Sequence, residues 1–162
     1  MHIRMRKYLS ALAGALALVL GVVGNAQTAD PYIGTWTINA AKSTSSGPLP
    51  KTRVLKIASA GADTIQVSVD EVSADDTKVT WSFTNTRDGK ESAVTGHPLM
   101  ETAATTSKGP RSGTTVYKKA GKVVMEVGTE VSADGKTFTT TSKGTDAQGK
   151  PVTSKMVYDR TS

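Results

Sequence analysis

The stretch TIQVSVDEV at residues 64–72 decides the fold class of this chain. Apolar side chains alternate in it with polar ones, and KVTWSFTNT at residues 78–86 repeats the alternation. A period of two places the apolar side chains on one face of a β-strand. Outside residues 1–26 the chain is rich in Thr, Val and Ser, which favour strands or turns over helix interiors. These patterns predict an all-β protein.

Turn signals follow one another at a steady interval along the chain. Asp-Gly pairs at residues 88–89 and 134–135 and Ala-Gly at 120–121 supply the positive φ of tight hairpins. They predict an antiparallel meander with strands near 33–39, 52–59, 64–72, 78–86, 90–95, 101–107, 112–119, 122–131, 136–143 and 151–160. Region 96–113, broken by two Gly-Pro-containing segments, is the least regular.

A meander of eight to ten strands can close into an up-and-down barrel or split into a sandwich. Closure removes the two edge strands, which would otherwise invite aggregation. Hairpins follow each other without long crossovers, so we favour the barrel over the sandwich.

The first 26 residues predict a secretory signal peptide. Arg4, Arg6 and Lys7 precede an apolar run at residues 9–23, and small residues precede a cut after Ala26. The run is shorter than the roughly 20 residues that span a bilayer, so we favour a cleaved signal over a retained anchor. We expect one domain, residues 27–162, in the periplasm or secreted.

Charge and cysteine content exclude several classes of partner. The chain has 20 basic and 14 acidic side chains, and three of the basic ones lie in the predicted signal, so the mature net charge falls from +6 to +3. That surplus gives no argument for nucleic acid as a partner. The absence of cysteine excludes disulfides, thiolate catalysis and a lipoprotein attachment point.

Two segments resemble those of a known superfamily. The opening Tyr32-Ile33-Gly34-Thr35-Trp36 resembles the Gly-x-Trp start of lipocalins and intracellular fatty-acid-binding proteins, and the closing Tyr158-Asp159-Arg160 resembles the last strand of the same calycin superfamily. Nearly the whole mature chain resembles bacterial exported lipocalin-like proteins, including Lys42-Ser43, Val94-Thr95-Gly96 and the hairpin at 132–137. The resemblance implies a barrel that holds a small ligand. We also expect Arg160 to lie over Trp36 and both to close the barrel.

The chain departs from this superfamily in ways that bear on the ligand. In fatty-acid-binding proteins an Arg two residues before the last-strand Tyr binds the fatty-acid carboxylate. Here that position is Met156, although Tyr158 matches. The helix–turn–helix lid of those proteins has no counterpart, because residues 42–50 are few and rich in Ser, Gly and Pro. These departures argue against a fatty acid.

No catalytic or metal-binding pattern stands out in the sequence. His97 is the only histidine after the predicted signal, and it lies between Gly96 and Pro98 in a predicted loop. A general base needs a positioned partner, and a transition-metal site needs several His or Cys ligands. We therefore expect neither an enzyme nor a cofactor.

The alternation also predicts which side chains face the lumen of the barrel. Those expected to contact a ligand are Leu55, Ile65, Val67, Trp81, Phe83, Met125, Met156 and Tyr158. Val116 and Val123 are expected to face inward as well, and Thr137, Thr139 and Thr141 to make part of the lumen polar.

Two functions remain open at this point. The favoured one is an exported lipocalin-like protein that binds a small molecule, apolar or of mixed polarity, in the lumen. The alternative is a non-catalytic structural or protein-interaction module of the cell envelope that uses its loops at 42–50 and 96–113.

Overall fold

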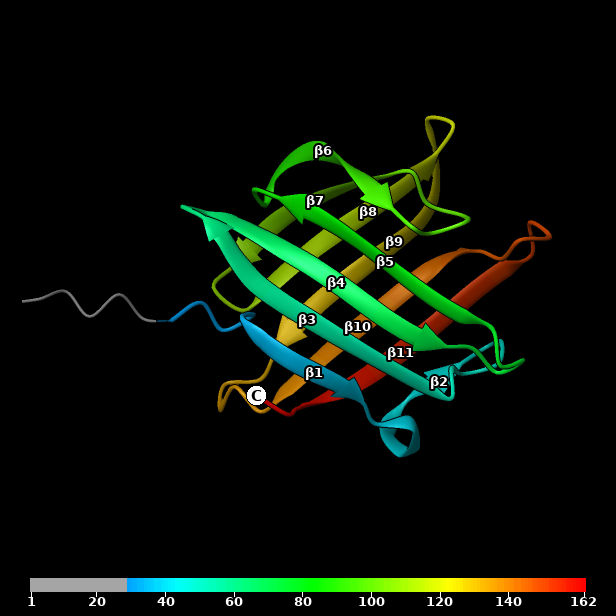
Figure 1. Cartoon of the computed structure of the whole chain (residues 1–162), viewed down its shortest axis with the longest axis horizontal. Coiled ribbons are helices and arrows are strands. Elements are labelled where there is room, and N and C mark those ends of the chain that lie inside the picture. Colours follow the sequence, from blue (N-terminus) through cyan, green and yellow to red (C-terminus); the bar gives the residue numbers. More distant parts are fainter. Residues whose placement is uncertain (1–28) are drawn as a thin grey trace, which may run out of the picture.

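Ten antiparallel strands close into a barrel in the computed structural model, which describes residues 29–162 (Figure 1). The predicted signal peptide, residues 1–26, lies outside the described residues. The strands are β1 (Gly34–Ile38), β2 (Thr44–Ser45), β3 (Thr52–Gly61), β4 (Thr64–Val72), β5 (Lys78–Asn85), β6 (Asp88–Thr95), β7 (Thr102–Gly109), β8 (Ser112–Lys119), β9 (Lys122–Val131), β10 (Thr137–Thr145) and β11 (Pro151–Arg160). The two-residue β2 pairs with Ser154 and Lys155 on the same edge of β11 as β1, and it is too short to count among the ten strands of the barrel.

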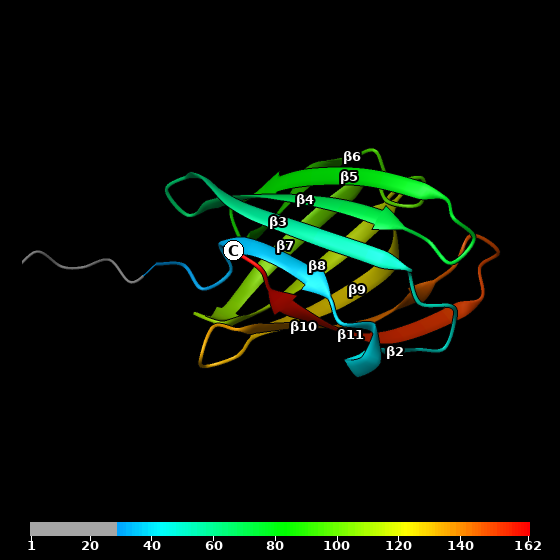
Figure 2. The same cartoon turned by 60° about the horizontal axis from the view of Figure 1, so that its bottom comes forward.

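The barrel closes because the first strand pairs with the last. From β3 to β11 each strand pairs with the next along the chain, and β1 pairs with both β3 and β11. In the closing ladder Trp36 lies opposite Arg160 and Ile38 opposite Tyr158. The C-terminus accordingly lies beside the start of β1 (Figures 1 and 2). The up-and-down barrel is confirmed, and the sandwich is excluded.

The strand bounds follow the alternation closely. All ten predicted strands are present, and both ends of each lie within about two residues of the expected positions. The irregular region 96–113 contains β7 and the hairpin to β8. The sequence did not predict the short 3₁₀ turn at Ala40–Lys42 or β2, because both are too short for a periodic pattern.

Aromatic side chains and one arginine close an end of the barrel. The Trp36 side chain is completely buried, its Nε1 donates to the Tyr32 carbonyl at 3.0 Å, and its ring packs on Phe138. The Arg160 guanidinium carbon lies 4.1 Å from the centroid of the Trp36 ring, as expected. Arg160 also donates to the carbonyls of Gly135, Ile33 and Pro31 at 2.6–2.7 Å. The tryptophan is thus held from both sides.

The barrel wall is weakest between β5 and β6. Only Ser82 with Thr95 and Phe83 with Val94 pair there, whereas β10 and β11 share nine pairs. Gly96 follows directly, with φ +88°, and a Cβ at this position would clash with the Thr80 carbonyl, so no other residue fits at this crossing.

Within the described part of the chain, no helix is long and apolar enough to cross a membrane.

Candidate ligand-binding cavity

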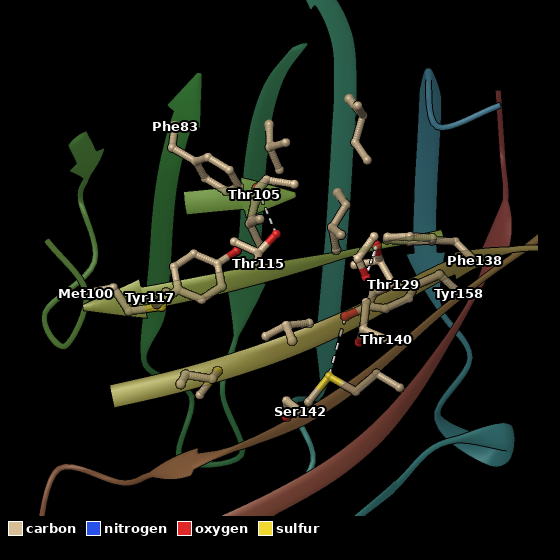
Figure 3. Close-up of a pocket in the computed structure, with 18 of the residues that line it drawn as sticks. Phe83, Met100, Thr105, Thr115, Tyr117, Thr129, Phe138, Thr140, Ser142 and Tyr158 are labelled. Carbon is tan, nitrogen blue, oxygen red and sulfur yellow. Dashed lines mark hydrogen bonds between the residues drawn. The ribbon is translucent and has the colours of Figure 1, made fainter. Parts of the chain in front are cut away.

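The barrel interior holds a cavity of about 240 Å³ (Figure 3). Every strand from β3 to β11 except β6 lines it, together with Tyr32 before β1, Ser45 and Pro48 at and after β2, and residues from the connections before and after β6. All eight side chains expected at the lumen line it, namely Leu55, Ile65, Val67, Trp81, Phe83, Met125, Met156 and Tyr158. The alternation therefore placed these residues correctly, while their role in binding a ligand stays a prediction.

One wall of the cavity is apolar and comes from β3, β4 and β5. Its side chains are mainly aliphatic on β3 and β4, with Trp81 and Phe83 on β5. The Trp81 and Phe83 rings stack at a centroid distance of 5.9 Å, and Tyr117 of β8 stands edge-on to both. Period-two alternation of large apolar residues on three adjacent strands produces this continuous surface.

The facing wall carries hydroxyl groups from β7 to β11. Figure 3 shows Thr105, Thr115, Thr129, Thr140 and Ser142 projecting into the pocket. The Thr105 and Thr115 hydroxyls lie 2.9 Å apart across β7 and β8, and those of Ser142 and Ser154 2.7 Å apart across β10 and β11. Each pair partly satisfies its own hydrogen-bonding capacity, so polar groups can face the cavity at low energetic cost.

The face of β10 that supplies hydroxyl groups to the cavity is the opposite of the predicted one. Thr137, Thr139 and Thr141 do not line the cavity. Thr140 and Ser142 line it instead, on the same face as Phe138, because side chains two apart share a face. The prediction assigned the face opposite Phe138 to the lumen, whereas Phe138 itself faces inward and this face changes from aromatic to hydroxyl along β10.

Two predicted inward valines face elsewhere. Val116 lies between the inward Thr115 and Tyr117 of β8, so it belongs to the outer face. Val123 is 60% exposed at the start of β9. A register irregularity between Tyr117 and Lys118, where β8 pairs with β9, breaks the alternation near Val123. In β8 the inward face carries Gly113, Thr115 and Tyr117, so apolar character alone selected the wrong face for Val116.

Arg53 of β3 is a cavity residue that the sequence reasoning missed. Its side chain is 23% exposed and pairs across the strands with Glu71 of β4, whose side chain is 14% exposed. Nε of Arg53 donates to Oε2 of Glu71 at 2.5 Å, and Nη2 contacts the same carboxylate. Nη1 points at the Met156 sulfur, 2.9 Å away. Burial alone would lower the pKa of Arg53, but Tyr158 and Glu71 outweigh it, so the pKa lies above its usual value.

The alternation of side chains along β3 and β4 contains a signal for the Arg53–Glu71 pair. Arg53 shares its face with Leu55 and Ile57, and Glu71 shares its face with Val69. A strict period of two therefore places both charged side chains on the inner face.

A second arginine lines the cavity at the end closed by Trp36. Nη2 of Arg87 lies 2.5 Å from Oδ2 of Asp30, and both side chains are about a quarter exposed. The Arg87 guanidinium also lies 5.8 Å from the Tyr32 ring centroid. Burial raises the pKa of Tyr32, so this phenol stays neutral at physiological pH.

Neutral donors also face the interior. Asn85 is 4% exposed, and its Oδ1 accepts from the backbone N–H of Arg87 at 3.0 Å. Its Nδ2 is buried and has no partner within residues 29–162. Burial raises the pKa of the Tyr117 phenol, which therefore remains a neutral hydroxyl.

His97 lines the cavity from the loop after β6. Its Nδ1 accepts the backbone N–H of Leu99 at 3.1 Å, and its ring stands edge-on to Trp81. Burial lowers the pKa of His97, with Glu71 opposing this effect, so the ring is neutral near pH 7. In the described part of the chain, no group of three or more His, Cys, Asp or Glu could hold a metal.

Solved structures with similar folds include two of the fluorescent protein UnaG. A point mutant of UnaG matches with a TM-score of 0.51 at 16% identity, covering 82% of this chain and 97% of that one. The wild type matches with 0.50 at 17% identity, covering 80% and 96%. Zebrafish ileal bile acid-binding protein, complexed with cholic acid, matches with 0.47 at 17% identity, covering 80% and 98%.

No protein-family model matches the chain, and no curated protein matches it. At these identities the likeness to solved structures concerns the fold. Together with the closed ten-stranded meander, the likeness to the two UnaG structures shows that this chain has a lipocalin-like up-and-down barrel fold.

Proposed function

We propose that this protein is an exported binding protein that holds a small, partly apolar molecule in its barrel cavity. The observation that carries the proposal is a cavity of about 240 Å³ with an apolar wall facing a hydroxyl wall. A molecule placed there transfers one face from water to Trp81, Phe83 and their aliphatic neighbours. Such burial contributes roughly 25 cal/mol per Å² of apolar surface.

The hydroxyl wall would set orientation and specificity. Ligand sites are typically apolar pockets of about 300–1,000 Å³ with a few placed polar groups. This cavity is close to the lower limit and so favours a small ligand. The calycin barrel supplies a closed wall around such a molecule.

Export is part of the same proposal and rests on residues 1–26. If the chain carrying a C-terminal tag is expressed in a bacterial host, the mature protein should be recovered from the envelope or medium. Its first residue should be Gln27, as read by N-terminal sequencing. Recovery of the uncut chain from the cytoplasm would contradict export but not ligand binding.

Ligand binding is tested with prodan, a small neutral dye whose emission depends on polarity. Wild-type protein should bind one equivalent saturably, with a blue-shifted emission. Val67→Phe, which fills the cavity from the apolar wall, should weaken binding at least ~10-fold. Gln66→Phe adds the same ring on the exposed face of β4 and should bind as wild type.

Circular dichroism confirms that each variant is folded. If Val67→Phe does not fold, Ser142→Leu fills the cavity from the opposite wall and replaces it. Absence of saturable binding by the wild type, or equal affinity in the filled and control variants, would refute a cavity ligand. Native mass spectrometry of protein recovered from its cellular source then gives the mass of the natural ligand.

A further inference from the structure

The residues that line the cavity carry a positive charge when considered alone. They include Arg53 and Arg87 but no Asp or Glu. Such a lining would suggest an anionic ligand. Two carboxylates that do not line the cavity pair with these arginines: Glu71 with Arg53 and Asp30 with Arg87.

Each arginine is already neutralised by the chain itself. Glu71 accepts from two nitrogens of Arg53, and Asp30 pairs with Arg87. Both carboxylates are on the same folded chain as their arginines, so a ligand anion must compete with a partner at high effective concentration. Displacing that partner would leave a second carboxylate poorly solvated, which is strongly unfavourable.

A further contact covers part of each guanidinium group. Nη1 of Arg53 faces the Met156 sulfur, and Arg87 lies against the Tyr32 ring. Met156 occupies the position at which fatty-acid-binding proteins have a carboxylate-binding arginine. The structure adds that Met156 covers the arginine that could have replaced it.

The polar groups left for a ligand are uncharged. They are the hydroxyls of the polar wall, the Tyr117 phenol and the buried Nδ2 of Asn85, which has no partner in the described residues. His97 also contributes a neutral ring. An unpaired buried N–H calls for an acceptor oxygen such as a carbonyl, ether or hydroxyl.

We infer that the cavity selects an electrically neutral molecule and rejects carboxylates. The selected molecule has a flat apolar face that packs on the Trp81–Phe83 wall and oxygen acceptors that face the opposite wall. The inference rests on the proposed function, because it defines the ligand class of the same cavity. The two internal ion pairs exclude charged ligands, because each pair prevents its arginine from binding an anion and its carboxylate from binding a cation.

The test uses three probes with one ring system and different charge: 2-naphthalenemethanol, 2-naphthoate and 2-naphthylmethylammonium. Each competes against bound prodan at neutral pH. In the wild type the neutral alcohol should compete at least ~10-fold more strongly than either ion, since an unpaired ion loses its hydration on entry.

Two variants should reverse the preference in opposite directions. Glu71→Gln leaves the Arg53 charge uncompensated, so the affinity for 2-naphthoate should rise at least ~10-fold. Arg53→Met leaves Glu71 uncompensated, so the ammonium probe should gain instead. Asp70→Asn is the matched control: it removes the same charge from the adjacent, exposed position of β4 and should leave all three affinities unchanged.

The outcomes separate this inference from the proposed function. If neither prodan nor any probe binds the wild type, the cavity-ligand proposal fails and the inference fails with it. If prodan binds but 2-naphthoate competes as well as the alcohol, only the neutral-ligand inference is overturned. The wild-type comparison decides this even where Glu71→Gln or Arg53→Met does not fold.

Discussion

At the scale of single residues, Arg160 does more than pair with an aromatic ring. It lies over Trp36 at 4.1 Å and donates to three backbone carbonyls from segments that meet at the barrel end. Gly34 makes room for it, because a Cβ at that position would clash with Nη1 of Arg160. The Gly-x-Trp opening and the final arginine are thus two halves of one packing arrangement.

Replacing Arg160 should destabilise the barrel markedly. Arg160→Ala removes a cation–π contact of about 0.5–2 kcal/mol and leaves three carbonyls without their donor, each costing roughly 1 kcal/mol. We expect a total loss of about 3.5–5 kcal/mol in the free energy of unfolding, measured by urea titration. Arg160→Lys should recover less than half of it, since an ammonium cannot donate in three fixed directions while stacking. Full recovery by lysine would mean that charge alone holds this end closed.

His97 should make stability depend on pH. Burial lowers its pKa in the folded state, whereas an unfolded histidine titrates near pH ~6.5. Below that pH the unfolded chain binds more protons at this side chain, so its stabilising contribution is present at higher pH and is lost as pH falls. His97→Gln should therefore show a smaller decrease in urea midpoint between about pH 7.5 and pH 5 than the wild type. An unchanged decrease in the variant would assign the effect to other groups.

At the scale of elements, the strands differ in how firmly the wall holds them. β6 makes only two ladder pairs with β5 and four with β7, and most of its side chains are exposed. β10 makes nine ladder pairs with β11 and seven with β9. Local stability follows the density of such pairings.

Amide hydrogen exchange should reveal this difference. Amides of β6 should exchange at least ~100-fold faster than those of β10 under native conditions, because the β5–β6 junction opens without global unfolding. Exchange followed by NMR or mass spectrometry measures both strands in one sample. Equal protection would show that side-chain packing across the junction compensates for the missing ladder.

At the scale of the whole molecule, closure joins the two ends of the described chain. The β1–β11 ladder pairs residues such as Trp36 and Arg160, which are far apart in sequence, and all ladders are antiparallel. The cavity exists only when this ladder forms, because it is bounded by strands on both sides of the closure. Binding and complete folding should therefore be coupled.

Refolding should be slow for a chain of this size. Closing a barrel end to end incurs the loop-closure entropy before the last contacts form, and such topologies refold in roughly milliseconds to seconds. Stopped-flow fluorescence of Trp36 and Trp81 after dilution from urea measures the rate. Complete recovery in microseconds would contradict closure as the limiting step.

The sequence by itself determined the strands, the meander and the eight lumen residues, because the alternation of side chains between faces is a local property of each strand. Only the tertiary structure decided that the meander closes, that Thr140 and Ser142 supply the polar wall, and that Arg53 and Glu71 neutralise each other inside it. These features depend on which strands face each other across the interior. Neither the distance between two inward charges nor the space left between two walls is encoded in the pattern of one strand.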